Sequence, residues 1–155
     1  SNIKGFDILY DAFKIVKEKC QNTYLLLSGK IDKDIDLKKP NIIFKTFPKR
    51  KDVVAAINAA DVAVLPNTEN VFTKYCFPYK VLEYMACKVP IVATNIGDIS
   101  KLLKNYEDSL CTPNSRSLAD KIIKNFNKNK VNYNIIKKYN WKNLSRKLDS
   151  ILRNI

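Results

Sequence analysis

The sequence predicts an α/β fold, a doubly wound parallel sheet with helices on both faces. Short and continuously apolar runs, such as residues 24–27 and 42–44, are typical of strands that are buried on both faces of a parallel sheet. Segments with apolar residues at helical spacing, such as residues 6–19, separate these runs almost throughout the chain. Strands that alternate with helices favour parallel pairing through right-handed crossovers.

The first half of the chain opens on a helix, because its apolar residues repeat at helical spacing from Phe6 onward. Ser28 and Gly29 close the first apolar run, and Pro66 stops the third. The elements predicted here are, in order, a helix over residues 6–19, strands over 24–27 and 42–44, a helix over 52–60 and a strand over 61–65.

The second half continues the alternation and then becomes helical after Pro113. The elements predicted here are a helix over residues 77–86, a strand over 90–94, a helix over 99–104, a weak strand at 110–111, and helices over 117–126 and 141–155. Residues 125–134 are rich in Asn and Lys, and we expect them to connect the C-terminal helices.

The length of 155 residues is that of one ordinary domain, so we expect a single unit over residues 1–155 with a C-terminal helix at 139–155. A doubly wound nucleotide-binding unit normally begins with a strand that feeds its first phosphate-binding turn, whereas this sequence begins within that turn. We therefore expect the first strand, and a whole preceding domain, to lie outside the sequence.

Composition excludes several kinds of chemistry. The sequence has no histidine, and its four cysteines lie far apart, so it offers neither a zinc site nor a Ser-His or Cys-His nucleophile. The simplest interpretation of these scattered cysteines is that they are reduced thiols of a cytosolic protein. No apolar run approaches the ~20 residues that span a bilayer. The net charge of +13 predicts attraction to phosphates, whether of a nucleotide, a nucleic acid or an anionic lipid.

Residues 78–94 read Pro-Tyr-Lys-Val-Leu-Glu-Tyr-Met-Ala-Cys-Lys-Val-Pro-Ile-Val-Ala-Thr. This segment resembles the donor-site signature of family-4 retaining glycosyltransferases, which belong to the glycosyl transferases group 1. Four shorter matches occur in the family's order: Lys4-Gly5-Phe6-Asp7, Ala59-Ala60-Asp61-Val62 before Leu65-Pro66, Gly97-Asp98-Ile99, and Pro113 before a terminal helix. The resemblance implies the Rossmann-like C-terminal half of a GT-B fold.

The resemblance also implies an activity. The complete protein would move a sugar from a nucleotide diphosphate sugar, with UDP or GDP as the nucleotide, to an acceptor glycan or glycolipid with retention of configuration. No metal or other cofactor would be required. The acceptor would bind to the missing N-terminal domain, so this chain alone would bind the donor and turn over little. The relatives suggest cell-envelope polysaccharide synthesis at the cytoplasmic face of the membrane, where the basic charge would contact anionic lipid.

Lys4, Gly5, Lys80 and Glu83 carry the site that the resemblance implies. Glu83 would accept hydrogen bonds from the ribose hydroxyls, since a carboxylate suits a diol. Lys4 would neutralise the diphosphate, which Gly5 would let the backbone approach closely. Lys80 precedes Glu83 by three positions, so the two share a helix face, and Lys80 either reaches the diphosphate as a second catalytic cation or only pairs with Glu83.

The sequence departs from the family at Tyr75, which stands where a first glutamate usually contacts the sugar, eight residues before Glu83. Tyr75 would contact the sugar or merely pack, and Tyr79 belongs to the same stretch of the expected donor site. Phe47 follows the second strand and would stack on the base, although a core or hinge position explains it equally well.

Two alternatives remain open. A non-catalytic partner subunit of the same fold is compatible with Tyr75 in place of the glutamate. A basic nucleic-acid-binding module would account for the charge, but the aromatic residues lie mostly on predicted apolar faces and no nucleic-acid motif is present, so we expect no specific nucleic-acid partner.

Overall fold

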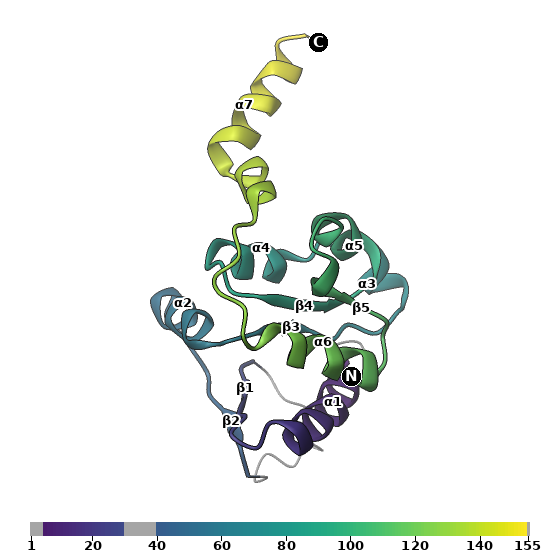
Figure 1. Cartoon of the computed structure of the whole chain (residues 1–155). Helices are drawn as coiled ribbons and strands as arrows, with labels where there is room; N and C mark the ends of the chain where they lie inside the picture. Colours follow the sequence, from purple (N-terminus) through teal and green to yellow (C-terminus); the bar gives the residue numbers. More distant parts are fainter. Residues whose placement is uncertain (1–4, 30–39, 155) are drawn as a thin grey trace.

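The computed structural model describes residues 5–29 and 40–154, and in these residues five short parallel strands form two sheets (Figure 1). The smaller sheet pairs β1 (Leu25–Leu27) with β2 (Ile42–Phe44). The larger has the order β3 (Ala63–Leu65), β4 (Ile91–Thr94), β5 (Leu110–Cys111). The predicted parallel α/β architecture is confirmed, but the strands fall into two sheets where the sequence predicted one.

Helices cover both faces of the larger sheet (Figure 1). On one side lie α3 (Val71–Tyr75), α4 (Tyr79–Ala86) and α5 (Gly97–Leu103), and on the other lies α6 (Ser115–Asn125), which packs on α1 (Phe6–Lys19). The remaining helical elements are α2 (Arg50–Ala59), η2 (Glu107–Ser109), η3 (Asn134–Tyr139) and α7 (Trp141–Leu152).

Strand β4 lies at the centre of the core, and all four of its residues are buried. Alternate side chains of a strand point to opposite faces. Ile91 and Ala93 accordingly pack with α4 and α5, whereas Val92 packs with α1 and α6. The sequence predicts such burial on both faces for residues 24–27 and 42–44, and there the prediction is wrong, because Leu26 and Ile43 are 41% and 48% exposed.

Tyr133 closes the amino end of β4. Its buried hydroxyl donates to the Val89 carbonyl oxygen at 3.0 Å and accepts from the Ile91 N–H at 3.1 Å. Burial raises the pKa of this phenol to about 12. Residues 125–134, which the sequence predicted to connect the C-terminal helices, are thus anchored in the core near their end.

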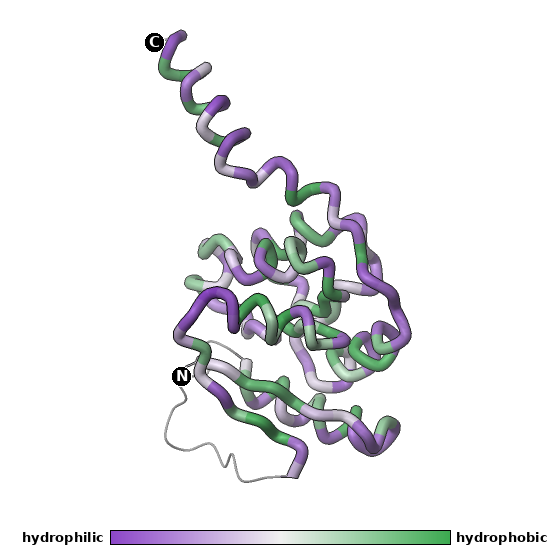
Figure 2. Tube along the Cα trace, turned by 90° about the vertical axis from the view of Figure 1, so that its left-hand side faces the viewer, coloured by the Kyte–Doolittle hydropathy of each residue, from purple (hydrophilic) through white to green (hydrophobic). Residues whose placement is uncertain are grey.

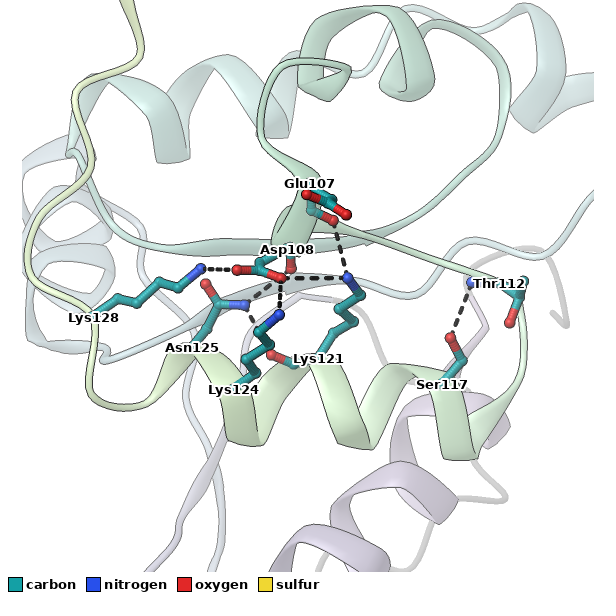
Figure 3. A network of polar contacts seen from close by, with 8 residues as sticks. All are labelled: Glu107, Asp108, Thr112, Ser117, Lys121, Lys124, Asn125 and Lys128. Carbon is teal, nitrogen blue, oxygen red and sulfur yellow. Dashed lines mark hydrogen bonds and ion pairs between the residues drawn. The ribbon is translucent and has the colours of Figure 1, made fainter.

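A polar network fixes α6 against η2 and β5 (Figure 3). The Asp108 carboxylate pairs with the ammonium groups of Lys124 at 2.7 Å, Lys128 at 2.6 Å and Lys121 at 3.5 Å. The Asn125 amide donates to the Asp108 carbonyl oxygen at 3.0 Å. Hydrogen bonds from Lys124 and Lys128 hold the pKa of Asp108 well below its usual range. Part of the basic excess is therefore neutralised within the fold.

The C-terminal helix α7 extends away from the body (Figure 1). Polar and apolar residues alternate along it (Figure 2), and its apolar side chains remain exposed. They are Trp141, Leu144, Leu148, Ile151 and Leu152. The predicted helix is confirmed up to Leu152, and its apolar side has no cover among the described residues.

Helix α3 is the main element that the sequence did not predict. It has five residues, too few to show a helical repeat, and it is set by its cap. The Asn70 side chain accepts from the Thr73 N–H at 2.9 Å, and the Thr73 hydroxyl oxygen accepts from the Asn70 N–H at 3.1 Å. This reciprocal arrangement is a capping box, which supplies partners for two otherwise unpaired N–H groups.

Candidate functional site

The candidate site lies at the carboxyl ends of β3 and β4, where open parallel sheets bind ligands. The buried Thr94 hydroxyl, at the end of β4, donates to the Asn67 carbonyl oxygen at 2.8 Å. This bond ties the end of β4 to the loop that leaves β3. That loop leads into α3 and then into α4, the helix that carries the donor-site signature. The bond therefore helps to position the segment that leads to α4.

Gly5 holds the start of α1 against the same loop. Its backbone is left-handed, with φ 61° and ψ 34°, and an added Cβ would lie 1.6 Å from the Pro66 carbonyl oxygen. Glycine is therefore required here by the approach of two protein backbones. The contact with a diphosphate expected of Gly5 stays a prediction, and Lys4 lies outside the described residues.

Gly97 brings the start of α5 close to the backbone of α3. Its φ is 54°, and an added Cβ would lie 2.6 Å from the Lys74 carbonyl oxygen. Two of the close backbone contacts in this region are thus made by glycines that the family-like motifs contain. Together they hold the starts of α1 and α5 against the segment that connects β3 to α4.

Lys80 and Glu83 form an exposed ion pair on α4, with 2.7 Å between the Lys80 ammonium and the Glu83 carboxylate. Their side chains are 59% and 47% exposed, so water screens the pair and it contributes little to stability. The predicted common helix face is confirmed. Because opening such a pair costs little, both groups are available to a ligand.

Exposed aromatic side chains flank this pair. Tyr75 ends α3 and is 75% exposed, and Tyr79 begins α4 and is 73% exposed. The Tyr79 ring meets Phe77 edge-on with 5.2 Å between centroids, and the Lys74 ammonium lies 6.0 Å from the Tyr75 ring centroid. Tyr75 therefore lies outside the core of the described residues, and its expected contact with the sugar stays a prediction.

Phe47 and Lys80 line one large cavity, although they are far apart in sequence. Phe47 is partly buried beyond the end of β2, and the Lys45 ammonium lies 5.9 Å from its ring centroid. Tyr84 lines the same cavity; burial, with the negative charge of Glu83 as the next cause, raises its pKa. The expected base-stacking position of Phe47 stays a prediction.

Within residues 5–29 and 40–154, no three His, Cys, Asp or Glu side chains gather as a metal site would require. No helix in this part of the chain is long and apolar enough to cross a membrane.

Comparison with known proteins identifies the family of this chain. Residues 1–128 match the family described as Glycosyl transferases group 1. The chain belongs to this family. The match spans all the candidate site residues, from Lys4 to Glu83.

Two related proteins are much longer than this chain. TuaH of Bacillus subtilis strain 168, a glycosyltransferase assigned to teichuronic acid biosynthesis, is 28% identical over 103 residues, which cover 61% of this chain and 26% of TuaH. The structure of sucrose-phosphate synthase (tll1590) from Thermosynechococcus elongatus superposes with a TM-score of 0.73 at 18% identity, covering 99% of this chain and 43% of the synthase. The synthase supports the GT-B, Rossmann-like fold.

Sequence reasoning missed several residues that position the candidate site. Thr94, Asn67 and Asn70 hold the loop between β3 and α4. The spacing of Asn70 and Thr73 fits an N-cap followed by a side chain that can bond back, and this signal could have identified α3. The bond from Thr94 to Asn67 joins positions 27 apart, and no local pattern predicts it.

Proposed function

We propose that this chain is the donor-binding half of a retaining glycosyltransferase that takes its sugar from a nucleotide diphosphate sugar. The observation that carries the proposal is the exposed Lys80–Glu83 pair on α4, the helix that follows β3 and α3 along the chain. The two groups offer the chemistry that such a donor needs, because Glu83 can accept two hydrogen bonds from a ribose diol and Lys80 can neutralise a phosphate.

The proposed chemistry relies on electrostatic stabilisation. Charge develops on the diphosphate as the bond to the sugar breaks, and cations placed at that point lower the barrier. Lys80, with Lys4 from the turn before α1, would supply this charge without a metal. Retention would follow if the acceptor attacks from the face that the leaving group vacates, with the donor phosphate assisting, as in family-4 enzymes.

The acceptor would bind to polypeptide outside these 155 residues. TuaH and the synthase are both longer than the matched segment. The exposed apolar side of α7 is available for contact with such a region. By analogy with TuaH, we propose a cell-envelope polysaccharide as the acceptor class and the cytoplasmic face of the membrane as the place of reaction, where Lys and Arg side chains would contact anionic lipid.

Calorimetric titration with UDP, GDP, ADP and their common sugar conjugates tests the donor site. One nucleotide should bind, and Glu83→Ala should weaken it by about 1–3 kcal/mol, as expected for loss of a charge-assisted hydrogen bond. Lys80→Ala should weaken the diphosphate more than the nucleoside monophosphate. Asp11→Ala is a matched control, because it breaks an exposed Lys–Asp pair of similar spacing on α1.

A non-catalytic subunit of the same fold is the second candidate, favoured by Tyr75 in place of the usual glutamate. The complete protein would then bind the donor without transferring its sugar. If no nucleotide binds at millimolar concentration to this chain or to the complete protein, both candidates are wrong.

A further inference from the structure

Helix α4 starts from a proline. Pro78 occupies its N-cap position, and a proline side chain has no atom that can accept hydrogen bonds from the first N–H groups of a helix. Two backbone bonds of 3.0 Å hold the first turn, from the Tyr79 N–H to the Phe77 carbonyl oxygen and from the Val81 N–H to the Pro78 carbonyl oxygen. This turn carries Lys80, so whatever holds Phe77 and Pro78 also determines which region the Lys80 ammonium can reach.

Phe77 is held by a residue from the C-terminal part of the chain. Its half-buried ring lies 5.5 Å from the ring of Tyr139, measured between centroids, with an angle of 40° between the ring planes. Phe77 also meets Tyr79 edge-on, so the three rings form a continuous row from η3 to the first turn of α4. Aromatic pairs at such separations attract one another beyond the effect of the apolar area that they bury.

The element that ends at Tyr139 is itself fixed at its other end. Helix η3 begins directly after Tyr133, whose hydroxyl bonds hold it to the backbone beside β4. The apolar residues of η3 pack against the same core cluster as α4, and the two elements are in contact. Helix η3 is therefore anchored by Tyr133 in the core and by Tyr139 beside Phe77, and it can transmit the position of the core to the start of α4.

The contact between Tyr139 and Phe77 is a feature that the family match does not predict, because the match covers residues 1–128 and Tyr139 lies beyond them. Tyr139 is half-buried and packs at the margin of the core. If it only filled space there, another apolar side chain of similar size would serve. If its ring holds Phe77 in place, an aromatic ring is required.

We propose that Tyr139 is a positioning residue of the candidate donor site: its ring holds Phe77, and through Phe77 it fixes the first turn of α4 and thereby Lys80. The link to a donor rests on the proposed function. The Lys80 side chain is long and 59% exposed, so only the backbone of this turn limits the positions of its ammonium. Electrostatic stabilisation requires charges that are already in place, so a loosened turn weakens the contact of Lys80 with a diphosphate.

Amide hydrogen exchange, measured by NMR on the 155-residue chain, tests the contact. Tyr139→Leu and Tyr139→Ala both remove the ring, whereas Tyr139→Phe keeps it. Phe126→Ala is the matched control, because Phe126 is a half-buried aromatic residue that packs against the other core cluster, with α1 and α6. The Val81 amide reports on the first turn of α4, and the Cys87 amide, bonded to the Glu83 carbonyl oxygen, reports on its last turn.

Loss of the ring should speed exchange at Val81 about tenfold relative to Cys87, because an aromatic contact contributes enough free energy to change a local opening equilibrium by that factor. Tyr139→Phe and Phe126→Ala should leave the ratio of the two exchange rates at the parent value. An unchanged ratio in both Tyr139→Leu and Tyr139→Ala overturns the proposal, and so does a ratio that changes equally in Tyr139→Phe.

Titration with nucleoside diphosphate and monophosphate supplies a readout that a purely structural residue would leave unchanged. For UDP against UMP and GDP against GMP, Tyr139→Leu should lower the preference of the parent for the diphosphate several-fold, because Lys80 would no longer be held near the second phosphate. Tyr139→Phe should keep the preference. An unchanged preference beside faster exchange at Val81 overturns the positioning role. The exchange test uses no nucleotide, so a parent chain that binds none contradicts the proposed function, while exchange still decides whether Tyr139 fixes α4.

Discussion

Replacing Tyr133 by phenylalanine should destabilise the protein without changing the shape of its core. The ring remains, packed 4.7 Å from Tyr106, but the hydroxyl that joins the Val89 carbonyl to the Ile91 N–H is lost. Strand β5 pairs with β4 only from Ala93 onward, so it cannot replace that hydroxyl at Ile91. Leaving buried backbone groups without partners costs about 1–3 kcal/mol each, so we expect a loss of about 2–4 kcal/mol.

Urea denaturation followed by circular dichroism at pH 7 measures this loss as a lower midpoint at an unchanged slope. Tyr24→Phe is the matched control, because Tyr24 is 64% exposed and its substitution should stay within about 0.5 kcal/mol of the parent. If Tyr133→Phe also stays within that range, the hydroxyl does not close the end of β4, and the reasoning fails.

The difference between Tyr133→Phe and the parent should shrink at high pH. Burial raises the pKa of Tyr133 from 10.0 to about 12. Below pH 10 the phenol is neutral in both the folded and the unfolded chain, and its contribution to stability is complete. Between pH 10 and 12 only the unfolded chain ionises, so the parent loses roughly 2–3 kcal/mol that the phenylalanine variant cannot lose. A constant difference from pH 8 to 11.5 would contradict this account.

Three further perturbations follow from the fold. Asp108→Asn should lower the free energy of unfolding at pH 7 by about 1 kcal/mol. Because the fold lowers the pKa of Asp108, the difference between the two proteins should shrink and then vanish as the pH falls below 4. Acid titration of the stability of both proteins measures this change. Iodoacetamide should modify exposed Cys76 well before Cys111, because burial raises the pKa of the Cys111 thiol to about 11. Mass spectrometry after partial labelling measures the order, and earlier modification of Cys111 would contradict the prediction. Gly5→Ala should lower the thermal midpoint far more than Gly29→Ala, since both have positive φ but only Gly5 faces a backbone oxygen; equal midpoints would refute the contact.

Elements with strong local patterns could be predicted from the sequence. The helix at 6–19 and the strands at 42–44 and 110–111 have the predicted bounds, and most other elements differ by only one or two residues at their ends. Lys80 and Glu83 also meet as predicted, because a spacing of three on a helix fixes their geometry.

Features that depend on distant contacts could not be predicted. The anchoring of Tyr133 depends on a bond to β4 from an Asn- and Lys-rich segment that looks like a simple connection. The division into two sheets depends on which strands pair with one another, and no local pattern encodes that pairing. Phe47 and Lys80 line a common cavity only because the loop after β2 and helix α4 border it together.

The hydrogen bonds of the Tyr133 hydroxyl to the backbone beside β4 can form only late in the synthesis of the chain. Tyr133 lies 42 positions beyond Ile91 and 44 beyond Val89. At a synthesis rate of about 5–20 residues per second, the ribosome adds Tyr133 roughly 2–8 s after the strand that it closes. During that interval water must satisfy the Val89 carbonyl and the Ile91 N–H, and the hydrophobic strand has an open end. The nascent chain therefore passes through a stage at which the residues of β4 have been synthesised but Tyr133 has not. This is the stage at which we expect a chaperone to bind the chain.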